Sequence, residues 1–226
     1  MRINNTELVQ ITAKYPGLEY RENTDYSSFV GEIILNHTYS ETCMTGNFNV
    51  EIIIPCKFPQ EFPKVRELNN RISKNYPHLY TNGQFCLASN LELKKYFYEN
   101  NNISAFLDDY IIPYLYTYRY YEEYGIYPFG ERSHGRMGDL EYLLELFQIS
   151  NINDLIDIMM YINNSNYRGH NLCPCGSGLK VRNCHGEIIK IFINSTLLED
   201  IQLILKEIEE VKKHNAREHY QTIKKV

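Results

Sequence analysis

The sequence predicts an α+β fold, because strand-like runs fill much of the first third of the chain and helical spacing dominates the rest. Runs of strands followed by runs of helices are typical of α+β proteins. The length of 226 residues allows one medium-sized domain with a small appendage. With 43% hydrophobic and 23% charged residues, the composition is that of an ordinary globular protein.

The first half is expected to begin with a short helix and to continue as strands. Residues 6–14 can form the helix, which Pro16 and Gly17 end. Three strand-like runs separated by polar turns follow at residues 18–21, 29–35 and 47–55. Three successive strands joined by short turns predict an antiparallel meander. A proline-rich irregular segment comes next, and another short strand is expected at residues 64–68.

After Cys86 the spacing of apolar residues becomes helical. Pro113 lies inside the longer of two expected helices and is expected to kink or split it. A glycine-rich segment follows, and Asp139 is expected to cap the next helix. The expected helices of this half are residues 91–99, 103–123, 140–147, 152–162 and 197–213.

The charge balance excludes some classes of partner. A net charge of -5 and an isoelectric point of about 5.8 give the chain no overall electrostatic reason to bind nucleic acid or anionic lipid. No signal-like apolar run follows the first residues, and no stretch approaches the ~18–20 apolar residues of a membrane span. We therefore expect a cytoplasmic protein that binds neither nucleic acid nor membrane.

The six cysteines fall into two groups. Three cluster between Cys173 and Cys184, and the others are dispersed at Cys43, Cys56 and Cys86. Without a secretory signal, this distribution predicts metal ligands in the cluster and reduced thiols elsewhere, in a reducing compartment.

The clustered residues predict a zinc site. Three thiolates and one imidazole match a closed, structural site whose four ligands are Cys173, Cys175, Cys184 and His185. The alternative is a group of unligated surface cysteines. These residues closely resemble the SEC-C module, which occurs at the C-terminus of the bacterial SecA translocation ATPase and on many other bacterial proteins. The resemblance implies zinc binding by these four residues and a docking role for the module.

A second informative stretch is the loop that precedes Cys86. A turn-rich loop there delivers a thiol directly before a helical region, where helix N–H groups can favour the thiolate. His78 lies on the same loop, within possible reach for hydrogen bonding or proton transfer. The alternative is a buried structural cysteine beside a solvent-facing histidine.

The loop resembles the active-site signature of ubiquitin-conjugating (UBC-fold) enzymes. That signature is His-Pro-Asn, a few residues, Gly, one residue, an apolar residue, then Cys-Leu. The residues in register with it are Pro77, Gly83, Phe85, Cys86 and Leu87. The order of helix, meander, proline-rich segment and strand is also similar, so the resemblance spans about residues 8–124. It implies a UBC-like fold with Cys86 as the thioester-forming residue.

The loop also departs from that signature. Tyr76 replaces the family's His, and His78 replaces its Asn, which helps to organise the oxyanion environment. The Pro-His pairing and the segment Gly130–Gly135 are similar to divergent UBC-like proteins of bacterial antiphage operons. Either His78 or His134 is therefore expected to assist Cys86, and the sequence leaves the choice open.

The resemblances divide the chain into four parts. Residues 1–125 form the UBC-like catalytic domain, 126–165 a glycine-rich segment with a helical extension, 166–190 the zinc module and 191–226 a C-terminal helix. The implied activity is transfer of the C-terminus of a ubiquitin-like modifier, or of a partner such as a nucleotidyltransferase of the CBASS type, from Cys86 to a target lysine. Activation by ATP would belong to a separate protein.

Two other functions stay open at this point. The first is a non-catalytic UBC-fold adaptor that docks partners through its surface and its zinc module. Retention of Cys86 counts against it, because inactive UBC variants usually lack that cysteine. The second is a SecA-associated export factor, which rests on the zinc module alone.

Overall fold

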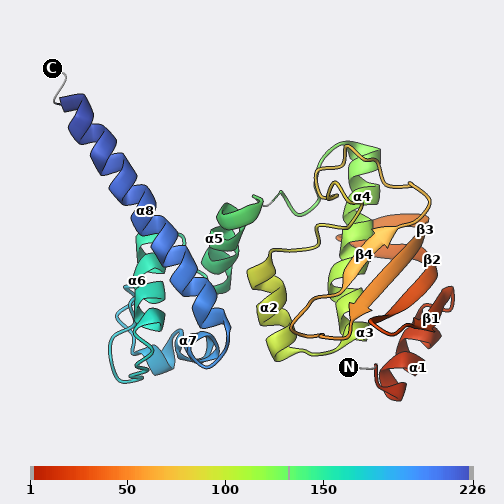
Figure 1. The fold of residues 1–226 in the computed structure, drawn as a ribbon, viewed down its shortest axis with the longest axis horizontal. Coiled ribbons are helices and arrows are strands. Elements are labelled where there is room, and N and C mark those ends of the chain that lie inside the picture. Colours follow the sequence, from red (N-terminus) through yellow and green to blue (C-terminus); the bar gives the residue numbers. More distant parts are fainter. Residues whose placement is uncertain (1–2, 132, 224–226) are drawn as a thin grey trace. The chain divides into compact units, whose positions relative to one another are not determined.

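The computed structural model describes residues 3–131 and 133–223, with side chains up to Lys213 (Figure 1). It confirms the α+β class, with a four-stranded antiparallel sheet followed by helices. The chain forms two compact units, Met1–Glu131 (unit 1) and Arg132–Val226 (unit 2). The finer division into four parts stays a prediction.

The sheet of unit 1 is a meander in which each strand pairs antiparallel with the next. Its strands are β1 (Leu18–Glu22), β2 (Tyr26–Tyr39), β3 (Thr42–Pro55) and β4 (Lys64–Glu67). Ser40 and Glu41, both with positive φ, form the two-residue turn between β2 and β3. This backbone matches the twist of the flanking strands, which is why such turns are common in hairpins.

The β2–β3 hairpin is longer than the sequence predicts, because its outer end has no apolar alternation. Residues 36–41 are exposed on both faces, so the hydrophobic pattern does not reveal them as strand. A buried tyrosine on helix α4 (Ile112–Tyr124) supports this end: the hydroxyl of Tyr116 donates to the carbonyl of Thr42 (3.1 Å).

Helices α1 (Asn5–Lys14) and α4 complete the core of unit 1. Helix α4 packs on β2 and β3 (Figure 1), where Phe29, Phe48 and Ile52 are fully buried. Helix α1 contributes a buried carboxylate, since Glu7 accepts from the backbone N–H groups of Ile103 and Ser104. Those donors have no intrahelical partner at the start of helix α3 (Ile103–Phe106), so Glu7 joins two helices that are distant in sequence.

The long helical run after residue 102 is interrupted, as the position of Pro113 predicts. Helix α3 continues as a π-helical turn, η1 (Leu107–Ile111), and the first turn of α4, which contains Pro113, follows directly. Helix α2 (Asn90–Glu99) precedes this run and follows the Cys86 loop directly, with Ser89 accepting from the backbone N–H of Glu92 (3.2 Å).

Unit 2 is helical. It contains α5 (Gly135–Leu146), α6 (Ile152–Asn163), the short 3₁₀ turn η2 (Val181–Asn183), α7 (Gly186–Ile193) and α8 (Leu197–Ile223). Its fully buried residues include Leu143, Phe147, Ile158, Ile189 and Phe192. The predicted cap at Asp139 is wrong: α5 begins four residues earlier, and Asp139 lies inside the helix, where it accepts from Arg136 (2.9 Å).

Within the described part of the chain, no helix has both the length and the apolar content needed to cross a membrane.

Candidate active site and metal centre

A tight turn in unit 1 brings His78 opposite Cys86. The N–H of Gly83 donates to the carbonyl of Tyr80, and the N–H of Tyr80 donates to the carbonyl of Gln84 (both 2.8 Å). Gly83 has φ +80°, a conformation that glycine adopts without strain. The two arms of the turn pair, and the N–H of Cys86 donates to the carbonyl of His78 (2.8 Å).

Helix α4 and strand β4 fix this turn in place. The buried Tyr114 of α4 donates its hydroxyl to the carbonyl of His78 (2.9 Å), and its ring stacks on Phe85 at a centroid distance of 4.3 Å. The N–H of Phe85 donates to the carbonyl of Val65 on β4 (2.8 Å). The residue directly before Cys86 is therefore held by both a strand and a helix.

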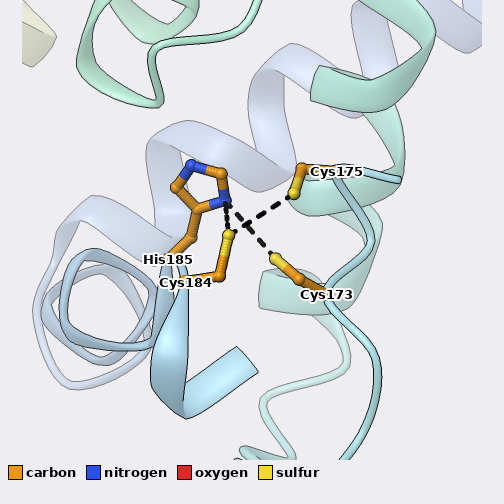
Figure 2. A group of neighbouring side chains, drawn as sticks. All are labelled: Cys173, Cys175, Cys184 and His185. Carbon is orange, nitrogen blue, oxygen red and sulfur yellow. Dashed lines mark hydrogen bonds between the residues drawn. The ribbon is translucent and has the colours of Figure 1, made fainter. Parts of the chain in front are cut away.

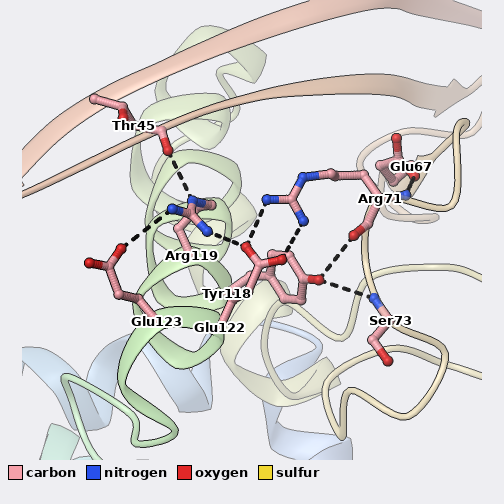
Figure 3. A network of polar contacts seen from close by, with 8 residues as sticks. All are labelled: Thr45, Glu67, Arg71, Ser73, Tyr118, Arg119, Glu122 and Glu123. Atoms are coloured by element: carbon pink, nitrogen blue, oxygen red, sulfur yellow. Dashed lines mark hydrogen bonds and ion pairs between the residues drawn. The ribbon is translucent and has the colours of Figure 1, made fainter.

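The segment upstream of the turn is tied to the same helix (Figure 3). The guanidinium of Arg71 binds both carboxylate oxygens of Glu122, at 2.5 and 2.7 Å. The hydroxyl of Tyr118 donates to the carbonyl of Arg71 (3.0 Å) and accepts from the N–H of Ser73 (3.2 Å). Hydrogen bonding to Arg71 holds the pKa of Glu122 below its ordinary value.

The thiol of Cys86 is partly exposed and has a hydroxyl beside it. Its Sγ lies 3.3 Å from the hydroxyl oxygen of Tyr80. This hydrogen bond raises the pKa of Tyr80 to about 12, so Tyr80 keeps its proton at neutral pH. The neutral thiol donates to Tyr80. Once Cys86 is ionised, the direction reverses and the Tyr80 hydroxyl donates to the thiolate.

The imidazole of His78 lies next to the same thiol. One of its ring nitrogens is within 4.8 Å of Sγ of Cys86, a separation that a small movement or one water molecule closes. The edges and faces of two tyrosines enclose the ring, with centroid distances of 5.5 Å to Tyr76 and 5.3 Å to Tyr127. Nε2 is 4.0 Å from a carboxylate oxygen of Glu131.

A cavity of about 310 Å³ opens beside the turn. It is lined by residues of the upstream segment, among them Ile72 and Lys74, and by the turn residues Tyr80 to Gly83. Tyr80 therefore forms part of the cavity wall and also contacts the thiol of Cys86 through its hydroxyl.

His134, the other predicted assistant, belongs to unit 2. It is the N-cap residue of α5, and its side chain forms no capping hydrogen bond there. Its predicted role toward Cys86, which belongs to unit 1, stays a prediction.

The four predicted metal ligands lie together in unit 2 (Figure 2). Nδ1 of His185 is 3.4 Å from Sγ of Cys173 and 3.4 Å from Sγ of Cys184. The sulfurs of Cys175 and Cys184 are 3.6 Å apart. Gly176 and Gly178, both with positive φ, let the backbone curl between the ligands. This group could hold a metal ion.

These distances fit a tetrahedral zinc ion. Zinc–sulfur bonds of about 2.3 Å and zinc–nitrogen bonds of about 2.0 Å give tetrahedron edges of about 3.5–3.8 Å between ligand atoms. The other nitrogen of His185, Nε2, is 2.8 Å from the carbonyl oxygen of Phe147. A carbonyl only accepts, so Nε2 carries the hydrogen and Nδ1 presents its lone pair to the sulfurs.

Two of the thiols differ in their ease of ionisation. Burial raises the pKa of Cys173 to about 12. At Cys175 burial also acts to raise the pKa, but hydrogen bonds from Ser177, Cys173 and Cys184 outweigh it and lower the pKa to about 6. A cation among these sulfurs would favour the thiolate at all of them, which is the reason that such clusters bind metals.

The sequence pattern does not identify two residues of the candidate active site. Tyr80 lies on the loop that the pattern singles out, but only the turn shows that its hydroxyl reaches Cys86. Glu131 lies in the glycine-rich segment, fifty-three residues after His78, and nothing in the sequence pairs the two.

Comparisons with known proteins give no relative. A scan against protein-family models and searches of the curated proteins and of the solved structures found no match to this chain.

Proposed function

We propose that the chain is a ubiquitin-conjugating-like cysteine acyltransferase with a UBC-like unit 1. The observation that carries the proposal is the environment of Cys86. A partly exposed thiol lies on a fixed turn directly before α2, with the Tyr80 hydroxyl at 3.3 Å and the imidazole of His78 within 4.8 Å. A nucleophile with a neighbouring base is the arrangement that covalent acyl transfer requires.

In the proposed reaction, the thiolate of Cys86 attacks the activated C-terminal carbonyl of a ubiquitin-like modifier or of a partner protein. A thioester forms and the activating group leaves. The amine of a target lysine then attacks this carbonyl, the C–S bond breaks with its electron pair returning to sulfur, and an isopeptide bond forms. His78 accepts the proton of the attacking group, and Tyr80 stabilises the departing thiolate.

The zinc site belongs to the proposal as a structural element. Zinc bound by Cys173, Cys175, Cys184 and His185 would join the loop of residues 173–185 to the end of α5 through the contact between His185 and Phe147. The SEC-C resemblance supports a docking role for this module. The proposed setting is a bacterial antiviral system of the CBASS type in the cytoplasm, with a separate ATP-dependent protein that activates the modifier or the nucleotidyltransferase.

The test compares wild type with Cys86→Ser in the presence of the proteins encoded beside it. Wild type is expected to form an adduct that thiol reductants remove, and Cys86→Ser a reductant-resistant oxyester or no adduct. Cys56→Ser is the matched control, because Cys56 is an exposed thiol on the same unit, outside the loop. Partner binding without any wild-type adduct would instead support the adaptor function.

A further inference from the structure

We propose that Glu131 positions and charges the imidazole of His78, so that Cys86, His78 and Glu131 act as nucleophile, base and orienting carboxylate. The inference deepens the proposed acyl transfer, because it names the groups that move the proton there. The resemblance to UBC-fold enzymes does not supply this set, since His78 occupies the place of an amide and Glu131 lies outside the matched loop.

The first support is that His78 lies close to both other groups and is held in place. Its backbone carbonyl is bonded to the N–H of Cys86 (2.8 Å), so its position along the chain is fixed relative to the thiol. Its side chain is only 16% exposed and has Tyr76 and Tyr127 on its sides. Moving the ring away from Cys86 would therefore break its contacts with both tyrosines.

The second support is the charge that Glu131 adds. Its carboxylate oxygen is 4.0 Å from Nε2 of His78, and half of the Glu131 side chain is in solvent. A carboxylate at this distance favours the protonated imidazole, which in turn favours a thiolate at Cys86. In the imidazolium both ring nitrogens carry a hydrogen, so Nε2 donates toward Glu131, and shortening of this contact would orient the ring for transfer.

The proton balance follows from these positions. For nucleophile formation, the S–H proton of Cys86 passes to His78 and leaves a thiolate and an imidazolium. As the thioester forms, the imidazolium gives this proton to the departing activating group and becomes neutral again. During the second step, the proton of the attacking amine passes to the neutral His78 while the C–S bond breaks and the electron pair returns to Sγ. Glu131 takes no part in these proton transfers; its role is to orient the ring.

The four tyrosines around His78 and Cys86 stay neutral in the range where this transfer occurs. Burial raises the pKa of Tyr76, Tyr114 and Tyr127, and the bond to Cys86 raises the pKa of Tyr80 to about 12. Between pH 5.5 and 9 these four hydroxyls therefore do not contribute to changes in the reactivity of Cys86.

The test is the pH dependence of Cys86 alkylation by iodoacetamide in the full zinc-loaded chain. Mass spectrometry of the peptide that contains Cys86 separates it from the other cysteines, and no modifier is needed. Wild type is expected to react at pH 6.5 about tenfold faster than His78→Gln, whose rate should rise only near pH 8.5 as for an ordinary thiol. Glu131→Gln should lose about threefold at pH 6.5, and Glu131→Asp should recover most of that loss.

The control is Glu61→Gln, which removes a carboxylate of unit 1 that is as exposed as Glu131 (51% against 50%) but pairs with Lys57. It should react as wild type does, and at pH 10, where an ordinary thiol is ionised without help from a base, all variants should react alike at Cys86. Unchanged profiles for Glu131→Gln, with a wild-type melting curve, would overturn the inference. If the variants change the pH profile of Cys86 alkylation as expected but wild type forms no adduct in the partner assay, only the proposed function is contradicted.

Discussion

The backbone N–H of Cys86 donates to the carbonyl of His78 at 2.8 Å, although the two residues lie on opposite arms of the turn around Gly83. This bond aligns the arms, and the hydroxyl of Tyr114 reaches the same carbonyl from α4. Backbone pairing and the contact with Tyr114 of α4 therefore fix the positions of Cys86 and His78. The distance between their side chains depends on the turn around Gly83.

Gly83→Ala tests that dependence. An alanine at φ +80° costs about 1–2 kcal/mol of folding free energy, and the turn can relieve this strain by opening. We expect a loss of stability in that range together with slower alkylation of Cys86 at pH 7. Gly125→Ala is the matched control, because Gly125 has φ +71° and, like Gly83, open space for a Cβ. It should cost similar stability without changing the reactivity of Cys86.

Tyr80→Phe tests the hydroxyl beside the thiol. Removal of one hydrogen bond to a thiolate is worth about 1 kcal/mol, so alkylation of Cys86 at pH 7 should slow by about fivefold. Tyr98→Phe, at a tyrosine that is equally exposed (52%), should have no effect. In the reverse experiment, Cys86→Ala should move the ultraviolet titration of Tyr80 from about 12 toward 10, the ordinary value for tyrosine.

Glu122→Gln tests the network that ties the upstream segment to α4. The pKa of Glu122 is lowered, so its charge stabilises the fold above the ordinary carboxyl value of 4.5, and this contribution is lost as the pH falls. The variant should be less stable than wild type by about 0.5–1 kcal/mol at pH 7, after allowance for partial solvent exposure. In urea melts at pH 3 the difference should shrink, and a difference that persists there would contradict the ionic origin.

Zinc removal tests the metal centre. One zinc per chain is expected, with loss on Cys175→Ser and retention on Cys43→Ser, which changes an exposed thiol outside the cluster. A chelator should unfold the segment from Cys173 to His185 and speed amide exchange at the end of α5, because His185 is bonded to the carbonyl of Phe147. Unchanged exchange at α5 after complete zinc loss would show that the metal does not hold this contact.

Some of these features could be predicted from the sequence. Cysteine spacing alone indicates a metal cluster, because the ligands lie close together along the chain. The apolar alternation of β3 near Ile52 predicts that strand. The polar end of the β2–β3 hairpin has no such alternation, and its strand structure rests on pairing between β2 and β3 and on the hydrogen bond from Tyr116. The pairing of Glu131 with His78 is a tertiary contact between distant residues, and no local pattern encodes it.

The most direct measurement of the central claim is the intact mass of the chain, isolated with its neighbouring gene products under non-reducing conditions. Acyl transfer at Cys86 predicts an added mass equal to the modifier or partner minus one water, removed by a thiol reductant and absent from Cys86→Ala. An unmodified mass in wild type, in the presence of ATP and an activating protein shown to be active, would contradict the account.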